Sequence, residues 1–175
     1  MSNIQKTYVQ AYLPSAQKVE AKYGISALFL LAQSGLESGY AAAKPGNAMF
    51  GIKADSSWKG DKQLLRTKEV LTTDKAKFPE VISVTKRPDG KFDYVVKDWF
   101  RKYATPEDSF ADYAQFLLKN KRYKTALLYK NDPVRFADEI AKAGYATDPV
   151  YAQKIKNVMG SLKSFFFNAN KSNQP

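Results

Sequence analysis

The sequence predicts an α+β protein that is mainly helical, with a small antiparallel β-lobe inserted between helices. Apolar residues recur at three- and four-residue steps near the amino terminus, which is the period of an amphipathic helix. From about residue 39 to residue 103 the pattern changes to short stretches of β-branched and aromatic residues separated by Gly and Pro. Three pairs of a capping residue and a proline then mark a return to helices. A length of 175 residues suits one domain.

Two helices are expected before the β-lobe. The first covers residues 4–23, with a kink or break at Pro14, and ends at Gly24. Ser26 can cap a second helix, whose first residues are apolar on every face, as in a helix buried at the centre of a domain. This second helix should stop near Gly39.

The β-lobe is expected over about residues 48–103. Its strands are predicted at 64–73, 81–85 and 92–96, and Pro88-Asp89-Gly90 is a turn sequence between the last two.

The later helices begin at Thr105-Pro106, Asp132-Pro133 and Asp148-Pro149. They are predicted at residues 106–119 with a short helix at 121–129, then at 133–143 and at 149–167. The domain would then cover residues 1–168, and residues 169–175 would be a flexible tail.

Basic residues outnumber acidic ones, with 28 Lys and Arg against 17 Asp and Glu, and the net charge of +11 is spread along the chain. Such a balance favours a polyanionic partner: nucleic acid, an anionic membrane or an acidic cell-wall polymer. One run, Lys119, Lys121, Arg122, Lys124 and Lys130, has no acid among its cations. A nucleic-acid-binding helical domain is one class that this charge suggests, but the chain has no helix-turn-helix, zinc or RRM signature, and no nucleic acid is expected as a partner.

The chain contains no Cys and no His. Their absence excludes Cys nucleophiles, Ser-His-Asp triads, disulfide scaffolds and metal or haem sites built on either residue. Catalysis must therefore use carboxylates, Tyr, Lys, Ser or Thr, and we expect no cofactor and no metal.

The first residues show no basic region followed by an apolar one, and no window approaches about 18 uninterrupted apolar residues. We expect no Sec signal peptide and no membrane span. If the protein acts outside the cytoplasm, it would be phage-encoded or delivered by a specialised export route.

Gln33 and Glu37 are the large polar residues of the second helix, and their spacing places both on one face. Glu37 could simply point at water, the commoner fate of a glutamate. However, a carboxylate at a helix carboxyl end faces the negative pole of the dipole, and an apolar neighbour would raise its pKa further. A raised pKa is what a general acid for glycosidic cleavage needs.

A series of motifs in this sequence resembles the N-acetylglucosaminidase domain of peptidoglycan hydrolases, glycoside hydrolase family 73, which includes the flagellar rod-cap hydrolase domain. The motifs are LLAQSGLESG at 30–39, NAMFGIK at 47–53, WKG at 58–60, FRKY at 100–103, SFADY at 109–113, NKRY at 120–123 and AGYATDPVYA at 143–152. They follow the family's order over about residues 10–165, and an ordered set is far more specific than any single motif.

The resemblance implies a lysozyme-like helical lobe, a β-lobe beside it and a glycan-binding groove between them. It also implies that Glu37 is the general acid, and Thr67-Lys68-Glu69 matches the setting of the family's second carboxylate. Glu69 would be a base or stabiliser, or alternatively a solvated strand residue paired with a Lys. An extra hairpin around Pro88-Asp89-Gly90 departs from the family pattern and leaves Asp61 and Asp74 as fallback candidates.

The same resemblance places Tyr145 next to the acid, where its ring could stack on a sugar and its hydroxyl could bond the N-acetyl group. Asp148 is expected to cap the helix that follows it, and Asp112 is expected to be more structural than catalytic. The residues expected to bind substrate are Gln33, Asn47, Phe50, Trp58, Tyr113 and Tyr151.

The expected function is an endo-β-N-acetylglucosaminidase that hydrolyses the β-1,4 bond after N-acetylglucosamine in peptidoglycan glycan strands, as a monomer in the periplasm or cell wall. Either Glu69 activates water or the substrate's acetamido group attacks with help from Tyr145. The alternatives are a muramidase or lytic transglycosylase on the same polymer, and a non-catalytic wall-binding module.

Overall fold

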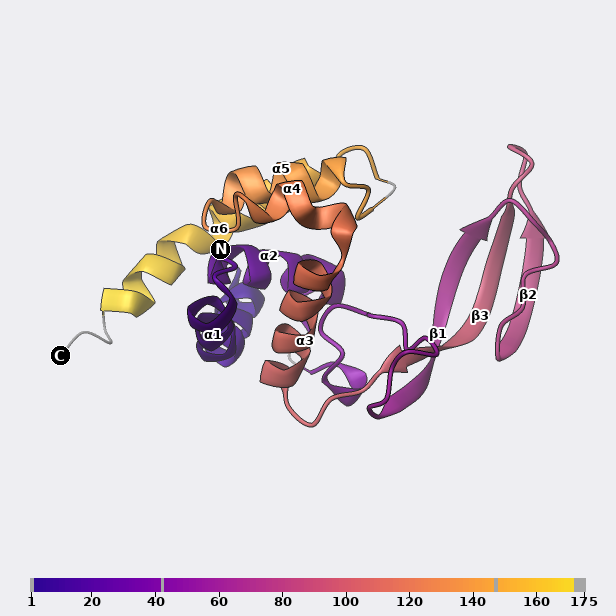
Figure 1. Ribbon diagram of the computed structural model, residues 1–175, viewed down its shortest axis with the longest axis horizontal. Coiled ribbons are helices and arrows are strands. Elements are labelled where there is room, and N and C mark those ends of the chain that lie inside the picture. Colours follow the sequence, from indigo (N-terminus) through magenta and orange to yellow (C-terminus); the bar gives the residue numbers. More distant parts are fainter. Residues whose placement is uncertain (1, 42, 147, 172–175) are drawn as a thin grey trace. The chain divides into compact units, whose positions relative to one another are not determined.

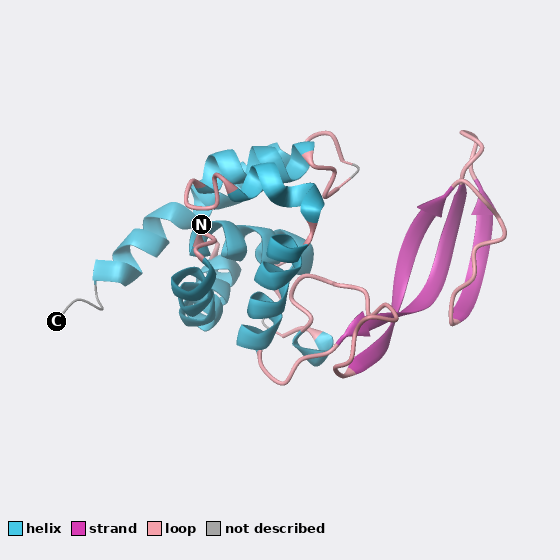
Figure 2. Ribbon diagram, viewed as in Figure 1, coloured by secondary structure: helices cyan, strands magenta, loops and turns pink. Residues whose placement is uncertain are grey.

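The computed structural model describes residues 2–41, 43–146 and 148–171, and its chain divides into two compact units (Figure 1). The helical unit comprises the described residues of Met1–Phe50 and Ala104–Pro175, and the sheet unit comprises Gly51–Tyr103. Figure 2 shows that the long helices belong to the first unit and the three strands to the second. The predicted mainly helical α+β class is confirmed.

Helix α1 (Asn3–Tyr23) opens with a capping box, in which Ser2 accepts the amide of Gln5 and the Gln5 side chain accepts the amide of Ser2. The predicted kink or break at Pro14 does not end this helix, which runs through it. Pro14 is exposed, so water can bond the carbonyl left without a partner, while the opposite face stays buried. Gly24 ends the helix in the left-handed conformation, as predicted, with φ 73°.

Helix α2 (Ala27–Ser38) is the buried central helix that the sequence predicts, and α1, α5 and α6 pack against it. Ser26 occupies the N-cap position, but its side chain makes no capping hydrogen bond, so the expected side-chain cap is wrong. Instead the Ser26 amide donates to the carbonyl of Lys130 at 3.0 Å. Burial of apolar side chains, such as Phe29 against Phe136 with centroids 4.6 Å apart, holds the helix.

The sheet unit is a three-stranded antiparallel sheet in the order β1-β3-β2. Strand β1 (Lys62–Leu71) and strand β2 (Glu80–Lys86) flank β3 (Phe92–Arg101), which continues five residues beyond its predicted end because it pairs with the first half of β1. The predicted turn is present at Gly90, where φ is 82° and the amide donates to the carbonyl of Arg87.

The remaining helices are the short η1 (Pro45–Asn47), then α3 (Pro106–Lys119), η2 (Lys121–Tyr123), α4 (Lys124–Leu127), α5 (Pro133–Lys142) and α6 (Tyr151–Lys171). Helices α3 and α5 begin at the predicted cap-proline pairs, whereas α6 begins two residues later than predicted. Helix α6 extends beyond the predicted end at residue 167, so residues 169–171 are helical and not a flexible tail, since neither Gly nor Pro interrupts this stretch. Residues 172–175 of the predicted tail lie outside the described part of the chain.

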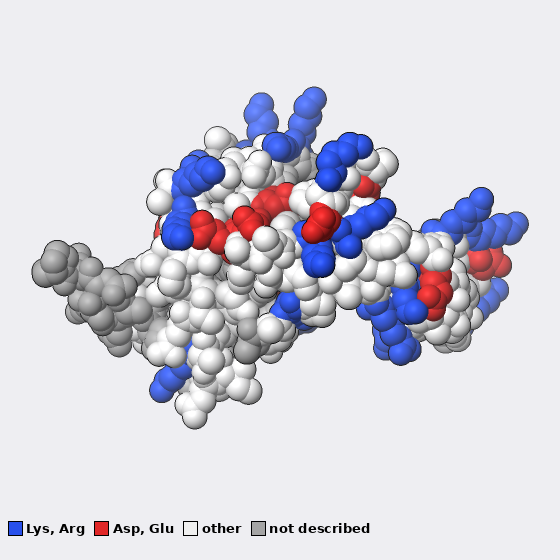
Figure 3. Space-filling view, turned by 90° about the horizontal axis from the view of Figure 1, so that it is seen from below, with Lys and Arg blue, Asp and Glu red and all other residues white. Residues whose placement is uncertain are grey.

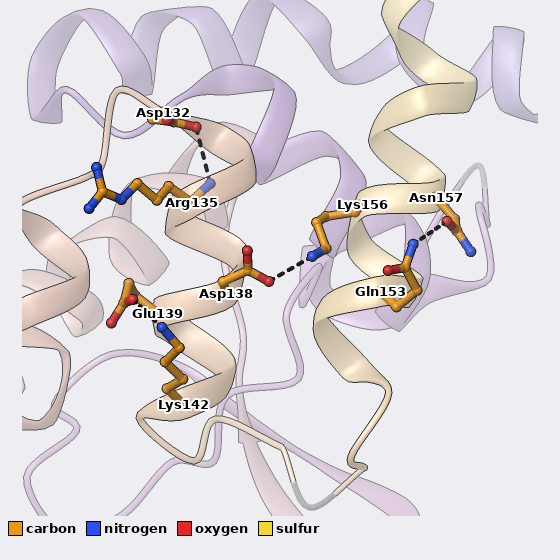
Figure 4. A network of polar contacts seen from close by, with 8 residues as sticks. All are labelled: Asp132, Arg135, Asp138, Glu139, Lys142, Gln153, Lys156 and Asn157. Carbon is orange, nitrogen blue, oxygen red and sulfur yellow. Dashed lines mark hydrogen bonds and ion pairs between the residues drawn. The ribbon is translucent and has the colours of Figure 1, made fainter.

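Polar contacts tie α6 to α5 on the surface of the helical unit (Figure 4). The Lys156 ammonium lies 2.8 Å from the Asp138 carboxylate, and Gln153 donates to Asn157 one turn along α6. These contacts help to fix α6, whose first residue, Tyr151, belongs to the candidate site described below. Among the described residues, no helix combines the length and apolar character that crossing a membrane requires.

Candidate active site

Glu37 lies in the last turn of α2, and its place is set by two features of the chain that follows. Gly39 takes the left-handed conformation, with φ 62°, and ends the helix. Tyr40 then turns back, donating its amide to the carbonyl of Gly35 at 3.0 Å. A Cβ on Gly35 would lie 2.7 Å from the Tyr40 ring, so the close approach of this ring requires glycine.

The Glu37 side chain is exposed, yet one side of its carboxyl group faces protein. The Tyr151 hydroxyl donates to Glu37 Oε1 at 3.1 Å. Desolvation by the surrounding protein raises the Glu37 pKa above its usual value, and this outweighs the lowering effects of the Tyr151 hydrogen bond and the Lys44 charge. The protonated acid is therefore favoured over a wider pH range than in an ordinary glutamic acid, which agrees in direction with the sequence-based expectation.

Gln33 lies one turn before Glu37 and is completely buried, at 0% exposure. Its Nε2 donates to the Tyr151 hydroxyl at 2.8 Å, and its Oε1 accepts the hydroxyl of Tyr113, which is also 0% exposed. Neither residue presents surface to a ligand in this structure, so the expected direct contact of Gln33 and Tyr113 with substrate is not supported by their burial. Their polar atoms bond to other protein side chains instead.

Tyrosine rings gather around this network. The Tyr145 ring stacks on the Tyr151 ring, with centroids 5.6 Å apart and planes 29° apart, and it meets Tyr113 edge-on at 6.1 Å and Tyr123 at 6.2 Å. Burial, followed by the charge of Glu37, raises the pKa of the Tyr145 and Tyr151 hydroxyls, so both stay protonated. Tyr145 is thus brought beside Glu37 as the sequence resemblance implies, and it keeps partial exposure.

Phe50 packs against Tyr113, and Asn47 bonds to the chain just before α3. The Phe50 ring stacks on the Tyr113 ring at 4.0 Å with planes 10° apart and is only 5% exposed, so it supports Tyr113 and offers little surface as a subsite wall. Asn47 has φ 52° and donates from Nδ2 to the carbonyl of Ala104 at 3.0 Å. Asn47 remains half-buried, and its role in binding stays a prediction.

Glu69 lies on β1 in the sheet unit, and it shares a cation with a carboxylate that the sequence reasoning missed. The Lys53 ammonium lies 2.7 Å from Glu69 Oε1 and 2.5 Å from Asp98 Oδ2. Asp98 is on β3 opposite Leu65, four pairs along the ladder from Glu69, so the two carboxylates share one face of the sheet. Only the register between strands reveals this pairing.

The shared cation holds its proton firmly. Desolvation disfavours the charged Lys53, but hydrogen bonds to Asp98 and Glu69 and the charges of both carboxylates outweigh it, so the Lys53 pKa is raised. Glu69 is therefore paired with a Lys, as one of the two sequence-based interpretations expected, and half-buried. This pairing is compatible with a functional carboxylate and with a purely structural one.

The fallback carboxylates and Trp58 complete the sheet unit. Asp61 and Asp74 are exposed, and the Asp61 carbonyl accepts the Trp58 indole N–H at 2.8 Å. The Arg101 guanidinium lies over the Trp58 ring, 4.5 Å from its centroid, and Tyr103 meets this ring edge-on at 5.9 Å. Trp58 is half-buried within its own unit, and its role as a subsite stays a prediction.

The basic run and the remaining aspartates have separate structural settings. Lys130 donates to the carbonyl of Tyr23 at the end of α1, and Arg122 donates to the carbonyl of Gly144, so two of the five cations serve the fold. Asp148 accepts the amide of Val150 at 3.0 Å in the turn before α6, which begins at Tyr151 and not directly after Asp148 as expected. Asp112 lies half-buried on α3. Figure 3 shows basic side chains projecting from both units on the viewed face.

The match to a family model covers most of the chain. The model described as mannosyl-glycoprotein endo-beta-N-acetylglucosaminidase, named Glucosaminidase, matches residues 13–164. The chain belongs to the glucosaminidase family. Membership agrees with the resemblance carried by the motifs around Glu37 and Tyr145, which both lie inside the matched region.

Several curated proteins align with nearly the whole chain. A peptidoglycan hydrolase FlgJ from Vibrio parahaemolyticus is 36% identical over 91% of this chain and 48% of its own length. One from Pseudomonas aeruginosa is 33% identical over 90% of this chain and 37% of its own length. The exo-glucosaminidase LytG of Bacillus subtilis is 29% identical over 89% of this chain and 50% of its own length. The chain thus spans half the length or less of these relatives.

Two solved structures share the fold of this glucosaminidase. A peptidoglycan hydrolase mutant from Sphingomonas sp. A1 superposes with a TM-score of 0.65 at 30% identity, covering 88% of this chain and 92% of the other. The catalytic domain of the autolysin Auto from Listeria monocytogenes gives a TM-score of 0.68 at 21% identity, covering 93% and 86%, and this second likeness concerns the fold alone.

Proposed function

We propose that this glucosaminidase is a peptidoglycan hydrolase that cleaves the β-1,4 bond on the reducing side of N-acetylglucosamine, with Glu37 as the general acid. The relatives named peptidoglycan hydrolase and exo-glucosaminidase support the polymer and the sugar. The assignment of the general acid rests on Glu37 itself, which is an exposed residue at the end of a buried helix. Desolvation raises the pKa of its carboxyl group, and the Tyr151 hydroxyl donates a hydrogen bond to it.

The first chemical step is the same in either mechanism. Glu37 donates its proton to the glycosidic oxygen as the bond from that oxygen to the anomeric carbon breaks, and the leaving sugar departs with a hydroxyl group. Positive charge develops on the anomeric carbon and ring oxygen. Glu37 becomes a carboxylate, which the Tyr151 hydroxyl stabilises through the hydrogen bond to Oε1.

The second step has two forms. In one, Glu69 takes a proton from water as the water oxygen bonds to the anomeric carbon, and the product forms directly. In the other, the acetamido oxygen of the substrate bonds to that carbon first, while Tyr145 orients the acetamido group. Water then attacks the anomeric carbon and passes one proton to the Glu37 carboxylate, as the bond from that carbon to the acetamido oxygen breaks. The partial exposure of Tyr145 beside Glu37 supports a contact with substrate.

The proposed setting follows from the substrate. A peptidoglycan hydrolase acts in the periplasm or cell wall, and the net charge of +11 suits a polymer that carries carboxylates and phosphates. We propose that the chain acts as a monomer on single glycan strands. Trp58 and Asn47 keep exposed surface and are the proposed contributors to sugar binding, whereas Tyr151 is only 6% exposed and its hydroxyl bonds to Gln33 and Glu37 instead.

Digestion of purified peptidoglycan tests this function. The soluble products are reduced with borohydride and analysed by mass spectrometry, with Glu37→Gln as the control protein. Reduced N-acetylglucosamine ends are the expected result. Reduced muramic ends would make the enzyme a muramidase, anhydro-muramyl ends a lytic transglycosylase, and wall binding without any release would identify a non-catalytic module.

A further inference from the structure

Three buried polar side chains from three helices form one continuous chain of hydrogen bonds that ends on Glu37. Tyr113 of α3 donates its hydroxyl proton to Gln33 Oε1, Gln33 of α2 donates from Nε2 to the Tyr151 oxygen at 2.8 Å, and Tyr151 of α6 donates to Glu37 Oε1 at 3.1 Å. Buried polar groups are usually bonded, and in this chain every donor points toward one exposed carboxyl group.

The direction of this chain follows from donor and acceptor counts. A tyrosine hydroxyl has one proton, and the Tyr151 oxygen already accepts from Gln33, so its proton is free to go to Glu37. The reversed amide of Gln33 would place Oε1 against Tyr151. That oxygen would accept the Tyr151 proton, and Glu37 would lose its donor.

Tyr113 prevents this reversal. Its hydroxyl donates to Gln33 Oε1 and also lies in hydrogen-bond contact with the Tyr145 hydroxyl, so a reversed amide would put a donor against Tyr113 and force the Tyr113 proton onto Tyr145 at a fully buried site. The Tyr113 ring is itself held by the parallel Phe50 ring at 4.0 Å. A residue without contact to Glu37 therefore decides which end of Gln33 faces Tyr151.

We propose that Tyr113, Gln33 and Tyr151 are positioning residues that form a relay, which fixes one oxygen of Glu37 as an acceptor and directs the transferable proton to the other. This inference rests on the proposed role of Glu37 as the acid. Among the described residues, none bonds to Glu37 Oε2, so this oxygen can face a substrate. When the proton leaves, the relay already points a donor at the new carboxylate.

Besides the relay, few titratable groups affect the pKa of Glu37. The groups that interact with the Glu37 carboxyl are Tyr151 at the start of α6, Tyr145 before it and Lys44 after α2. Burial raises the pKa of the Tyr113 and Tyr151 hydroxyls, so both remain donors throughout the pH range in which a carboxyl group titrates. Tyr151 lowers the Glu37 pKa against the larger effect of desolvation.

The test compares Tyr113→Phe and Tyr151→Phe with Tyr8→Phe. Tyr8 is a matched control because it is 1% exposed, and its hydroxyl donates to Ser34 of the same helix α2 at 2.7 Å, outside the relay. Each change removes one buried hydroxyl and keeps the ring. The Glu37 pKa is read from the side-chain carboxyl carbon by NMR, with Glu37→Gln to assign the signal, beside the pH profile of kcat/KM and a thermal melt.

Tyr151→Phe should raise the Glu37 pKa by about one unit, because a hydrogen bond to the charged form is lost. Tyr113→Phe should raise it in the same direction by a smaller amount, although Tyr113 makes no contact with Glu37. The alkaline limb of kcat/KM should move upward with the pKa. Tyr8→Phe should lower the melting temperature alone.

A Glu37 pKa that is the same in Tyr113→Phe and Tyr8→Phe overturns the relay, even if Tyr151→Phe shifts it, because Tyr151 would then act as an isolated partner. Failure of the proposed function gives a different result. If Glu37→Gln retains activity, the pH profile no longer reports on Glu37, and the carboxyl signal in the NMR titration alone decides for or against the relay.

Discussion

The two units hold their carboxylates in different ways. In the helical unit, Glu37 is bonded through Tyr151 to side chains that are fully buried. In the sheet unit, Glu69 and Asp98 share Lys53, and the Glu69, Asp98 and Lys53 side chains are 30%, 20% and 41% exposed. One arrangement is fixed by neutral donors within a core, and the other by a cation in contact with water.

This difference bears on catalysis. A general acid needs a defined proton position and a shifted pKa, and a buried network of neutral donors supplies both. A group that assists water must exchange partners during the reaction, and a partly solvated ion pair contributes only about 0–1 kcal/mol, so it can be broken at little cost. We therefore expect the helical unit to dominate the rate.

The largest effect should come from Glu37→Gln, because the amide keeps the shape of the side chain and its bond from Tyr151 but has no proton to transfer. The rate of peptidoglycan solubilisation should fall by about 100- to 10,000-fold. Retention of half the wild-type rate would remove Glu37 from the mechanism and reverse the comparison between the units.

Glu69→Gln and Asp98→Asn test how much the carboxylates of the sheet unit contribute to the rate. If Glu69 activates water, Glu69→Gln should cost a rate factor comparable to that of Glu37→Gln, whereas attack by the acetamido group predicts a much smaller loss. Asp98→Asn is the matched control, since it removes the other carboxylate bound to Lys53. Rates of all three variants on one substrate give the answer. A large loss in Asp98→Asn, Asp61→Asn or Asp74→Asn with none in Glu69→Gln would contradict the assignment of Glu69.

Tyr145→Phe should have a smaller effect. A net hydrogen bond contributes about 0.5–1.5 kcal/mol, so loss of one to the acetamido group should lower kcat/KM by at least about threefold if the contact tightens in the transition state. The stacking of this ring on Tyr151 is kept in the variant, but its hydrogen bond with the Tyr113 hydroxyl is lost, so the melting temperature should fall slightly as well. Unchanged kinetics would leave Tyr145 with a packing role only.

The smallest expected effect concerns stability. The Glu37 pKa is raised in the folded chain, so the folded state holds this proton more firmly than the unfolded state, and the ionised form costs stability as pH rises through the folded pKa. Relative to wild type, Glu37→Gln should therefore be more stable near neutral pH than near about pH 4. Thermal melts across this range provide the check, and a difference of opposite sign would contradict the raised pKa.

Local signals predicted much of the fold because they act within a few residues. The pairs Thr105-Pro106 and Asp132-Pro133 start α3 and α5 where expected. Gly24 and Gly39 end α1 and α2 where expected. Pro14 shows the limit of such signals. Packing of a whole helix face outweighed one missing hydrogen bond, and no local pattern reports on that packing.

The site was predictable only in part, for the same reason. Glu37 could be found because it is a carboxylate near the end of a helix whose first residues are apolar, and Gln33 because it is one turn away. The partners of Gln33 are 80 and 118 residues away along the chain, so its role as a bonded, buried residue depends on tertiary structure. Asp98 was missed because the register between β1 and β3 is not visible in either strand alone.

Strand β2 has a consequence for the behaviour of the protein in concentrated solution. It forms one edge of the sheet, all seven of its residues are exposed, and they include Val81, Ile82 and Val84. An open edge with apolar side chains invites a second copy to pair along it. The irregular register between Val81 and Ser83 interrupts the row of backbone donors and acceptors, and Glu80 and Lys86 charge its ends, so the edge offers a poor template for polymerisation.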